Sequence, residues 1–242
     1  MIQLSRRLQA VADLITQEGV LADIGTDHGY IPIYLIQNGR IKKAIAADIK
    51  EGPLFRAKEH IERYGLSDYI EIRLSDGAKN IRSGEADVFV LAGMGGGLMY
   101  RILSQSRLVF EGAKEIILQP QSEQEQLRRN LIGDGWKILE EDMVEEDGKY
   151  YPMMRISMYF SEKVRQKNLY EDAKDIEYLY GAYLLDGKHP ILKEFLKKQG
   201  ELYQNLLKEL SALPENPGVK KRIAQIERKA DLTKEAVEKT ER

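Results

Sequence analysis

The sequence has no cysteine, a single tryptophan and no long uncharged hydrophobic run. Without cysteine the chain forms no disulfide and no zinc ribbon, and it has no thiol nucleophile. The longest uncharged stretch in the first half, Val88 to Tyr100, is shorter than the about 20 residues that a membrane-spanning helix needs. Residues 1–10 are amphipathic and lack the apolar core of a signal peptide. We therefore expect a cytoplasmic protein that does not enter a membrane.

A strong charge of either sign is also missing. The net charge is −2 over 242 residues, divided into −5 for residues 1–162 and +3 for residues 163–242. A nucleic-acid-binding protein usually carries a basic face, and only the last third leans basic, so composition alone predicts no nucleic-acid partner. With 43% hydrophobic and 31% charged residues, the chain is neither collagen-like nor low-complexity and disordered.

Short apolar runs alternate with helical patterns over the first 160 residues. The runs predict strands at 20–24, 44–49, 70–74, 86–91, 115–118, 136–143 and 151–159. Helical patterns cover 4–16, 30–38, 53–64, 98–103 and 123–134. Strands separated by helices predict an α/β fold with right-handed crossovers and a mostly parallel sheet. The last two strands are joined too tightly for a parallel crossover, so we expect an antiparallel hairpin at the end of the sheet.

The last third of the chain changes character. Apolar residues recur at spacings of three and four on both sides of the breaker at 214–218, PENPG. This pattern predicts an antiparallel helical hairpin of coiled-coil type. We place the boundary near residues 160–166, which predicts one domain over 1–162 and a helical hairpin over 163–242.

The segment 23–29, DIGTDHG, follows the first predicted strand directly. Glycine at position 25 permits a sharp turn and lets backbone N–H groups approach a ligand. The helix that follows adds further donors and the positive end of its dipole. In doubly wound sheets, ligands bind at the carboxyl ends of the strands, where this loop lies. The alternative is a glycine-rich turn that binds nothing.

Asp48 ends the second strand, where an acidic residue accepts hydrogen bonds from the ribose hydroxyls of a nucleoside-containing cofactor. A nicotinamide site prefers Gly-x-Gly-x-x-Gly, but here Asp27 stands where the second glycine would be. A carboxylate is unfavourable beside a pyrophosphate and favourable beside the sulfonium and amino groups of S-adenosylmethionine. The loop therefore favours S-adenosylmethionine over NAD. Residues 93–97, GMGGG, are expected to form a loop that lets the backbone approach the cofactor or the substrate.

Several segments together resemble the bacterial tRNA (adenine-N1)-methyltransferases that modify adenine 22. They are 21–32 (LADIGTDHGYIP), 44–48 (AIAAD) with 51–53 (EGP), 92–96 (AGMGG), 118–121 (LQPQ) and 148–151 (GKYY). The similarity covers about residues 4–156, and the helical hairpin fits the same family. The resemblance implies a Rossmann-like class I methyltransferase fold that transfers methyl from S-adenosylmethionine to N1 of adenine in tRNA.

The resemblance also implies a set of cofactor-binding residues. Asp48 would take the ribose hydroxyls and Asp76 the exocyclic amine of the cofactor adenine. The implied set is Asp23, Gly25, Thr26, Gly29, Asp48, Ile49, Asp76, Gly77, Gly93, Met94 and Gly95.

Methyl transfer to adenine N1 needs alignment more than proton transfer, because N1 has a lone pair and the sulfonium is already activated. A carboxylate stabilises the cationic product, and Asp27 is our candidate. His28 and Tyr30 are candidates for orienting the base. The alternatives are a loop-stabilising role for Asp27 and a purely structural role for His28.

N1 lies on the pairing edge of adenine, so the enzyme needs an unpaired or extruded base. The candidates for contacting the base or the RNA are Arg6, Arg7, Gln119, Gln121, Tyr150, Lys197, Lys198, Lys220, Lys221 and Arg222. Any one of these lysines and arginines could instead lie on a solvated helix face without touching RNA. A tyrosine in a strand could instead pack in the core. His60 and His189 have no metal-ligand partners nearby in the sequence, so we expect surface roles for them and no metal site.

Three other functions remain as alternatives. The same cofactor could serve a small-molecule substrate, but the helical hairpin argues against this, because enzymes of small molecules more often add a lid over the pocket. The chain could be a non-catalytic tRNA-binding module on a decayed methyltransferase fold, which the retained acidic and glycine residues argue against. A nicotinamide dehydrogenase is disfavoured by Asp27. The sequence leaves the oligomeric state open and favours a monomer.

Overall fold

The computed structural model describes residues 1–158, 168–214 and 216–241. The chain divides into two compact units, Met1–Asn168 and Leu169–Arg242. The predicted domain boundary, between residues 162 and 163, lies outside the described residues, and so does Tyr159 of the last predicted strand. The domain division of the sequence therefore stays a prediction.

The first unit is built on a seven-stranded sheet in the order β3-β2-β1-β4-β5-β7-β6. The strands are β1 (Val20–Ile24), β2 (Lys43–Asp48), β3 (Ile70–Leu74), β4 (Val88–Gly95), β5 (Glu115–Ser122), β6 (Lys137–Glu146) and β7 (Lys149–Ser157). The strands β1 to β5 pair in parallel, and β7 pairs antiparallel with both β5 and β6. The predicted mostly parallel sheet with an antiparallel last hairpin is confirmed.

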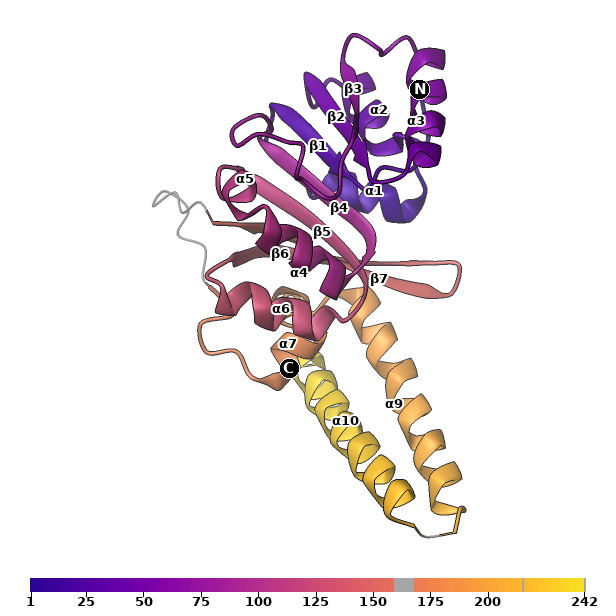
Figure 1. Ribbon diagram of the computed structural model, residues 1–242. Coiled ribbons are helices and arrows are strands. Elements are labelled where there is room, and N and C mark those ends of the chain that lie inside the picture. The colour runs from indigo at the N-terminus through magenta and orange to yellow at the C-terminus, as the bar shows by residue number, and fades with distance from the viewer. Residues whose placement is uncertain (159–167, 215, 242) are drawn as a thin grey trace. The chain divides into compact units, whose positions relative to one another are not determined.

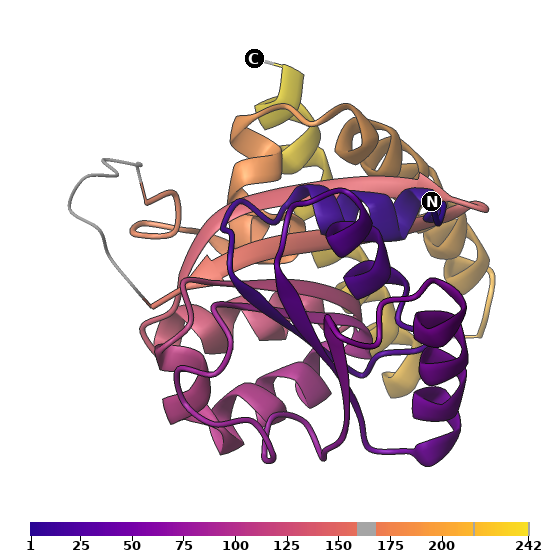
Figure 2. The ribbon, with the colours of Figure 1, turned by 90° about the horizontal axis from the view of Figure 1, so that it is seen from above.

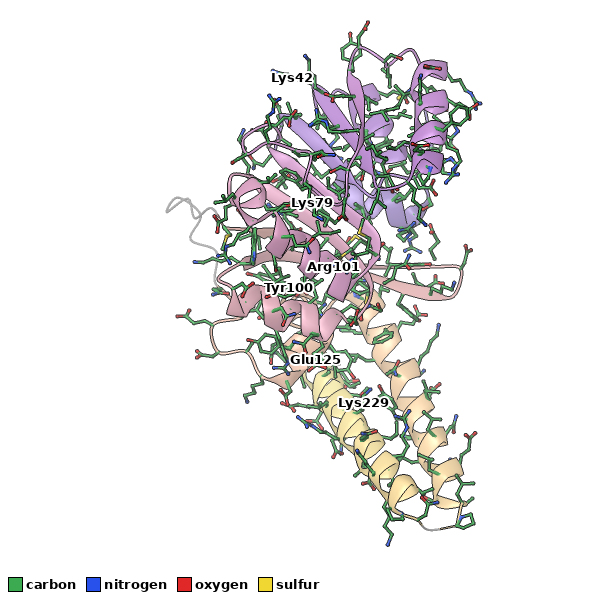
Figure 3. All side chains as sticks on the ribbon, viewed as in Figure 1. Lys42, Lys79, Tyr100, Arg101, Glu125 and Lys229 are labelled. Carbon is green, nitrogen blue, oxygen red and sulfur yellow. The ribbon has the colours of Figure 1, made fainter. Side chains whose placement is uncertain are left out.

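Helices cover both faces of this sheet (Figures 1 and 2). The helices on one face are α1 (Arg6–Asp13), α2 (Tyr30–Gln37) and α3 (Glu51–Arg63), and those on the other are α4 (Gly96–Gln105), α5 (Arg107–Glu111) and α6 (Gln124–Gly133). The Tyr100 hydroxyl, labelled in Figure 3, donates to Asp134 Oδ2 at 2.9 Å and ties α4 to the end of α6. Because both faces are covered, the central strands are mostly apolar, and Val88 to Leu91 are fully buried.

The glycine-rich segment 93–97 does not form the expected loop. Strand β4 continues through Gly95 with an irregular register between Ala92 and Met94, and α4 begins at Gly96. The strand continues because pairing with β5 extends to Ser122. A Cβ at Gly96 would lie 2.8 Å from the Glu123 carbonyl oxygen, so glycine is required here for packing. The predicted helix at 98–103 was too short, and α5 was not predicted.

The second unit contains four helices, α7 (Asp175–Tyr180), α8 (Ala182–Asp186), α9 (Pro190–Ser211) and α10 (Pro217–Glu241). The predicted antiparallel hairpin is formed by α9 and α10 (Figure 1). The short helices α7 and α8 were not predicted, because five or six residues carry too little periodicity. Both helices pack on α10, and the Tyr180 hydroxyl lies 2.7 Å from Thr233 Oγ1. In α9, the residues that recur at spacings of three and four differ in burial: Leu192 and Leu196 are buried, whereas Gln199, Tyr203, Leu206 and Leu210 are half-buried.

None of the helices in the described ranges is long and apolar enough for a membrane crossing.

Candidate active site

Two adjoining hollows lie at the edge of the sheet where β1, β2, β3 and β4 end. The larger, about 400 Å³, is called here the Asp48 hollow, and the smaller, about 310 Å³, the Tyr30 hollow. The Asp48 hollow is lined by Ile24, Gly25, Asp27, Asp48, Ile49, Lys50, Pro53, Arg56, Ser75, Asp76, Gly77, Ala92, Gly93, Met94, Leu98, Arg101 and Ile102. The Tyr30 hollow is lined by Arg7, Leu8, Asp23, Gly25, Asp27, His28, Tyr30, Ile31, Ala92, Gly93 and Gln121. Four of these residues line both hollows, namely Gly25, Asp27, Ala92 and Gly93.

The loop after β1 is held tightly to β2. The backbone N–H groups of Gly25 and Thr26 both donate to the Ala47 carbonyl, at 2.8 and 2.9 Å. Gly25 has φ +77°, and a Cβ at this position would lie 2.2 Å from Met94 Cε. Glycine therefore permits both the turn and the close approach of Met94 from the end of β4.

Asp23 brings a buried carboxyl group to the Tyr30 hollow, and the residue is only 6% exposed. Its pKa is raised from 3.8 to about 6, chiefly by burial; the hydrogen bond with the Thr26 side chain lowers this pKa, and the charge of the nearby Asp48 raises it. Burial disfavours the ionised carboxylate, so a cationic group bound in this hollow would favour ionisation and lower this pKa.

Asp48 and Asp76 stand at the ends of neighbouring strands and both line the Asp48 hollow. Asp48 Oδ1 accepts a hydrogen bond from the Lys50 backbone N–H at 2.8 Å. Asp76 forms an ion pair with Lys79, a residue labelled in Figure 3.

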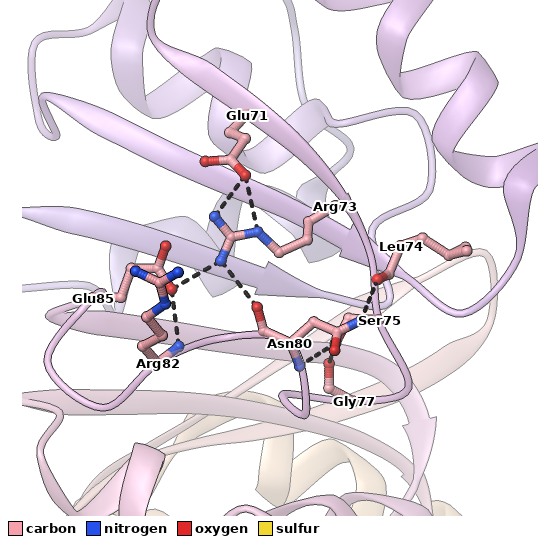
Figure 4. Close-up of polar contacts among 8 residues, drawn as sticks. All are labelled: Glu71, Arg73, Leu74, Ser75, Gly77, Asn80, Arg82 and Glu85. Atoms are coloured by element: carbon pink, nitrogen blue, oxygen red, sulfur yellow. Dashed lines mark hydrogen bonds and ion pairs between the residues drawn. The ribbon is translucent and has the colours of Figure 1, made fainter.

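A polar network holds the loop that carries Asp76 (Figure 4). Ser75 Oγ donates to the Gly77 carbonyl at 2.8 Å and accepts from the Asn80 backbone N–H at 3.1 Å. The Asn80 amide donates to the Leu74 carbonyl at 2.8 Å. Arg73 donates to the Asn80 carbonyl at 3.1 Å, and its hydrogen bond to Glu85 lowers the pKa of that carboxyl group. The loop is thereby fixed at both of its ends.

Asp27, His28 and Tyr30, the three candidate catalytic residues, lie together at the Tyr30 hollow. Asp27 Oδ1 accepts two hydrogen bonds from Arg56, at 3.2 and 2.7 Å, and His28 Nε2 lies 3.5 Å from the same oxygen. The rings of His28 and Tyr30 stack with centroids 5.1 Å apart, and His60 stacks against both, at 5.2 and 5.4 Å. His60 is half-buried in this cluster, so its predicted surface role is wrong.

Arg7 reaches the Tyr30 hollow from α1 and is held by two partners. Its guanidinium lies 5.5 Å above the Tyr151 ring and donates to Gln119 Oε1 at 2.8 Å. Gln119 Oε1 also accepts from the Gly93 N–H at 3.2 Å. Gln119 is fully buried and lines neither hollow, whereas Gln121 is exposed and lines the Tyr30 hollow.

The remaining predicted residues lie outside both hollows. Thr26 is a buried residue of the first loop, Gly29 caps α2, and Gly95 caps α4. Arg6 is exposed on α1, and Tyr150 lies opposite Glu145 in the last hairpin. Five exposed cations belong to the second unit, namely Lys197, Lys198, Lys220, Lys221 and Arg222. Of these, Lys198 pairs with Glu194 at 2.8 Å within α9.

Sequence reasoning missed several residues that line or support the hollows, namely Arg56, His60, Ser75, Asn80, Leu98, Arg101 and Ile102. Only Ser75 carried a signal, because it precedes the predicted Asp76. Arg101 appears in Figure 3 on α4. Within the described ranges, the structure contains no group of three or more His, Asp or Glu residues arranged to hold a metal ion.

Comparison with known proteins shows the family to which the chain belongs. A family model described as "Methyltransferase domain" matches residues 4–154. The tRNA (adenine(22)-N(1))-methyltransferase of Bacillus subtilis (strain 168) is 31% identical over 238 residues, covering 98% of each chain. The crystal structure of the B. subtilis m1A22 tRNA methyltransferase TrmK covers 98% of this chain and 100% of its own, with 29% identity and a TM-score of 0.84. Sp1610 of Streptococcus pneumoniae, solved in complex with S-adenosyl-L-methionine, covers 97% of this chain and 100% of its own, with 29% identity and a TM-score of 0.82. The family suggested by the sequence motifs is thereby confirmed, and the chain belongs to the tRNA (adenine(22)-N(1))-methyltransferases.

Proposed function

We propose that this chain transfers the methyl group of S-adenosylmethionine to N1 of adenine 22 in tRNA. The observation that carries the proposal is the pair of adjoining hollows, because a two-substrate transfer needs two sites that meet at the reacting atoms. Gly25, Asp27, Ala92 and Gly93 line both hollows and mark where donor and acceptor meet.

The Asp48 hollow suits the adenosine part of S-adenosylmethionine. Asp48 supplies a carboxylate for the ribose hydroxyls, and Asp76 supplies one for the exocyclic amine. Ile49, Leu98 and Ile102 provide apolar surface for the faces of the adenine ring. Bound there, the cofactor supplies a methyl group already activated on a sulfonium.

Asp23 fits the charged end of the same cofactor. It is a buried carboxyl group with a raised pKa, and a bound ammonium group would stabilise its ionised form. Two carboxyl groups stand at the first loop, those of Asp23 and Asp27, and they suit a cationic cofactor. A pyrophosphate would meet the Asp27 carboxylate and be repelled.

The Tyr30 hollow suits the target base. The stacked rings of His28 and Tyr30 offer an aromatic face, on which an extruded base can stack. Asp27 accepts a hydrogen bond from the adenine N6 amine and stabilises the positive charge that develops as N1 is methylated. Guanine is rejected, because it carries a carbonyl oxygen in place of N6 and a proton on N1.

Positioning supplies most of the catalysis, since no proton has to be moved before N1 attacks the methyl carbon. Gln121 reads the edge of the base, and Arg7 binds a phosphate beside it from its fixed place over Tyr151. The exposed cations of α9 and α10 bind tRNA phosphates further along the RNA. We assign no step to a metal ion.

The direct test is transfer of labelled methyl from S-adenosylmethionine to an unmodified tRNA transcript, with the product located by nuclease mapping. The matched control is the same transcript with guanine at position 22. Label on N1 of adenine 22 that disappears in the control supports the proposal. If the cofactor binds but no label appears on several tRNAs, the proposal is wrong and the search moves to small-molecule acceptors.

A further inference from the structure

Two side chains of α3 reach the same short segment of the first loop. Arg56 donates through Nε and a terminal nitrogen to Asp27 Oδ1, at 3.2 and 2.7 Å. His60 Nδ1 lies 3.0 Å from the His28 carbonyl oxygen, so its Nδ1–H is the donor. Residues four apart lie on one face of a helix, so this face of α3 contacts both loop residues.

The segment that they contact has an unfavourable backbone conformation. His28 has φ +69° and Gly29 φ +67°, so two successive residues lie in the left-handed region. A residue with a side chain stays there only when its surroundings hold it. The hydrogen bond from His60 to the His28 carbonyl and the stacked rings supply that hold.

Helix α3 is a rigid base for these two contacts. Leu54, Ala57 and Ile61 bury its inner face. A Cβ at Gly29 would lie 3.5 Å from Ala57 Cβ, so α3 packs directly on the loop. Functional side chains are most precisely placed when the elements that support them are packed in this way.

The contacts also determine which oxygen of Asp27 is available. Both Arg56 donors and His28 Nε2 approach Oδ1. Oδ2 accepts no hydrogen bond from the described part of the chain. Since the Asp27 side chain is 60% exposed, without Arg56 it would rotate among solvated conformers.

We propose that Arg56 and His60, named here the α3 clamp, are positioning residues for methyl transfer. Arg56 holds Asp27 through Oδ1 and leaves Oδ2 to receive the adenine N6 amine, while His60 holds the backbone on which Asp27 and His28 stand. This inference rests on the proposed function, which gives Asp27 its contact with the base. The alternative is that Arg56 binds a tRNA phosphate, because S-adenosylmethionine has no phosphate for a cation in this hollow to bind.

The test compares steady-state methylation of tRNA by wild type, Arg56→Ala, Arg56→Lys and Asp27→Asn, with Arg63→Ala as the matched control. Arg63 is an exposed arginine of the same helix, outside both hollows. We expect Arg56→Ala to lower kcat about tenfold and to leave the KM for tRNA and the Kd for S-adenosylhomocysteine within about twofold, since tenfold is the effect of one modest transition-state contact. Lysine cannot make both hydrogen bonds to Asp27, so the kcat of Arg56→Lys should lie between those of wild type and Arg56→Ala. In the Asp27→Asn background, Arg56→Ala should cost less than about twofold.

His60 is tested by its two replacements. His60→Asn keeps a hydrogen-bond donor near the place of Nδ1 and should retain the wild-type kcat within about threefold. His60→Leu has no donor, and its kcat should fall about tenfold. Hydrogen exchange of residues 25–31 gives a readout that does not need activity. Exchange should be about tenfold faster in Arg56→Ala and His60→Leu and unchanged in Arg63→Ala.

Separate results overturn the two proposals. A wild type inactive on tRNA contradicts the proposed function, and hydrogen exchange then decides the clamp by itself. An active wild type with unchanged kcat in Arg56→Ala, or with equal losses in the wild-type and Asp27→Asn backgrounds, overturns the clamp. So does a loss confined to the KM for tRNA with a shallower salt dependence, because that result marks a phosphate contact.

Discussion

Replacing Asp23 with asparagine should stabilise the protein while weakening its cofactor site. The pKa of Asp23 is about 6 in the folded protein against an ordinary value of 3.8, mainly because the group is buried. Between these values the unfolded chain releases the proton and the folded chain keeps it, so folding becomes less favourable as the pH rises. A pKa difference of one is worth about 1.4 kcal/mol, so ionised Asp23 costs about 3 kcal/mol above pH 7 and about half of that at pH 5.

Urea unfolding of wild type and Asp23→Asn without cofactor measures this cost. Trp136 is the single tryptophan, is buried just before β6, and reports unfolding of the first unit by fluorescence. We expect the variant to gain about 3 kcal/mol over wild type at pH 7.5, and the gain should shrink steadily toward pH 4. Calorimetry should show weaker binding of S-adenosylmethionine by the variant.

The two measurements separate the electrostatic cost from a packing change. A gain in stability that does not vary between pH 5 and 7.5 would refute the argument, because only an ionisable group with a raised pKa gives that dependence. Lower stability of the variant at pH 7.5 would show that Asp23 is stabilised by contacts stronger than its burial penalty. If the variant binds S-adenosylmethionine as tightly as wild type, Asp23 does not contact the cofactor.

Three further predictions concern packing and RNA binding. The ion pair between Arg128 and Glu141 is almost fully buried at 2.7 Å, so Glu141→Gln should cost about 3–5 kcal/mol in urea unfolding, and replacing both residues with apolar ones should cost less. Gly96→Ala places a Cβ 2.8 Å from a backbone oxygen and should lower the melting temperature by several degrees, whereas Gly133→Ala, whose Cβ meets nothing, should not. Filter binding at several salt concentrations should show weaker tRNA affinity and a salt slope smaller by about three when alanine replaces Lys220, Lys221 and Arg222. If the salt dependence of tRNA affinity does not change, these three residues do not contact tRNA phosphates.

The order and type of the main elements follow from the sequence, because the sheet is buried on both faces. Continuous apolar runs mark β1, β2 and β4, and the tight connection after β6 forces an antiparallel hairpin. Element ends were less predictable. Strand β4 continues through Gly95 because its partner β5 is long, a pairing that no local pattern reveals. Helices α5, α7 and α8 are too short to show a period.

Residues that follow a strand could be predicted as site candidates from the sequence alone. Strand ends meet at one edge of a parallel sheet, so the positions of Asp23 and Asp48 predict that they lie together there, and the family resemblance adds Asp76. Tertiary structure decided how the site is supported. Arg56 and His60 are polar residues on a helix, and their spacing looks the same whether they face solvent or a loop. Gln119 and Gln121 were alternative candidates for contacting the base, and the register of β4 and β5 buries Gln119 beneath Gly93. Spacing along the chain determines which strand ends meet, whereas the packing of α3 and the pairing of β5 determine which side chains reach them.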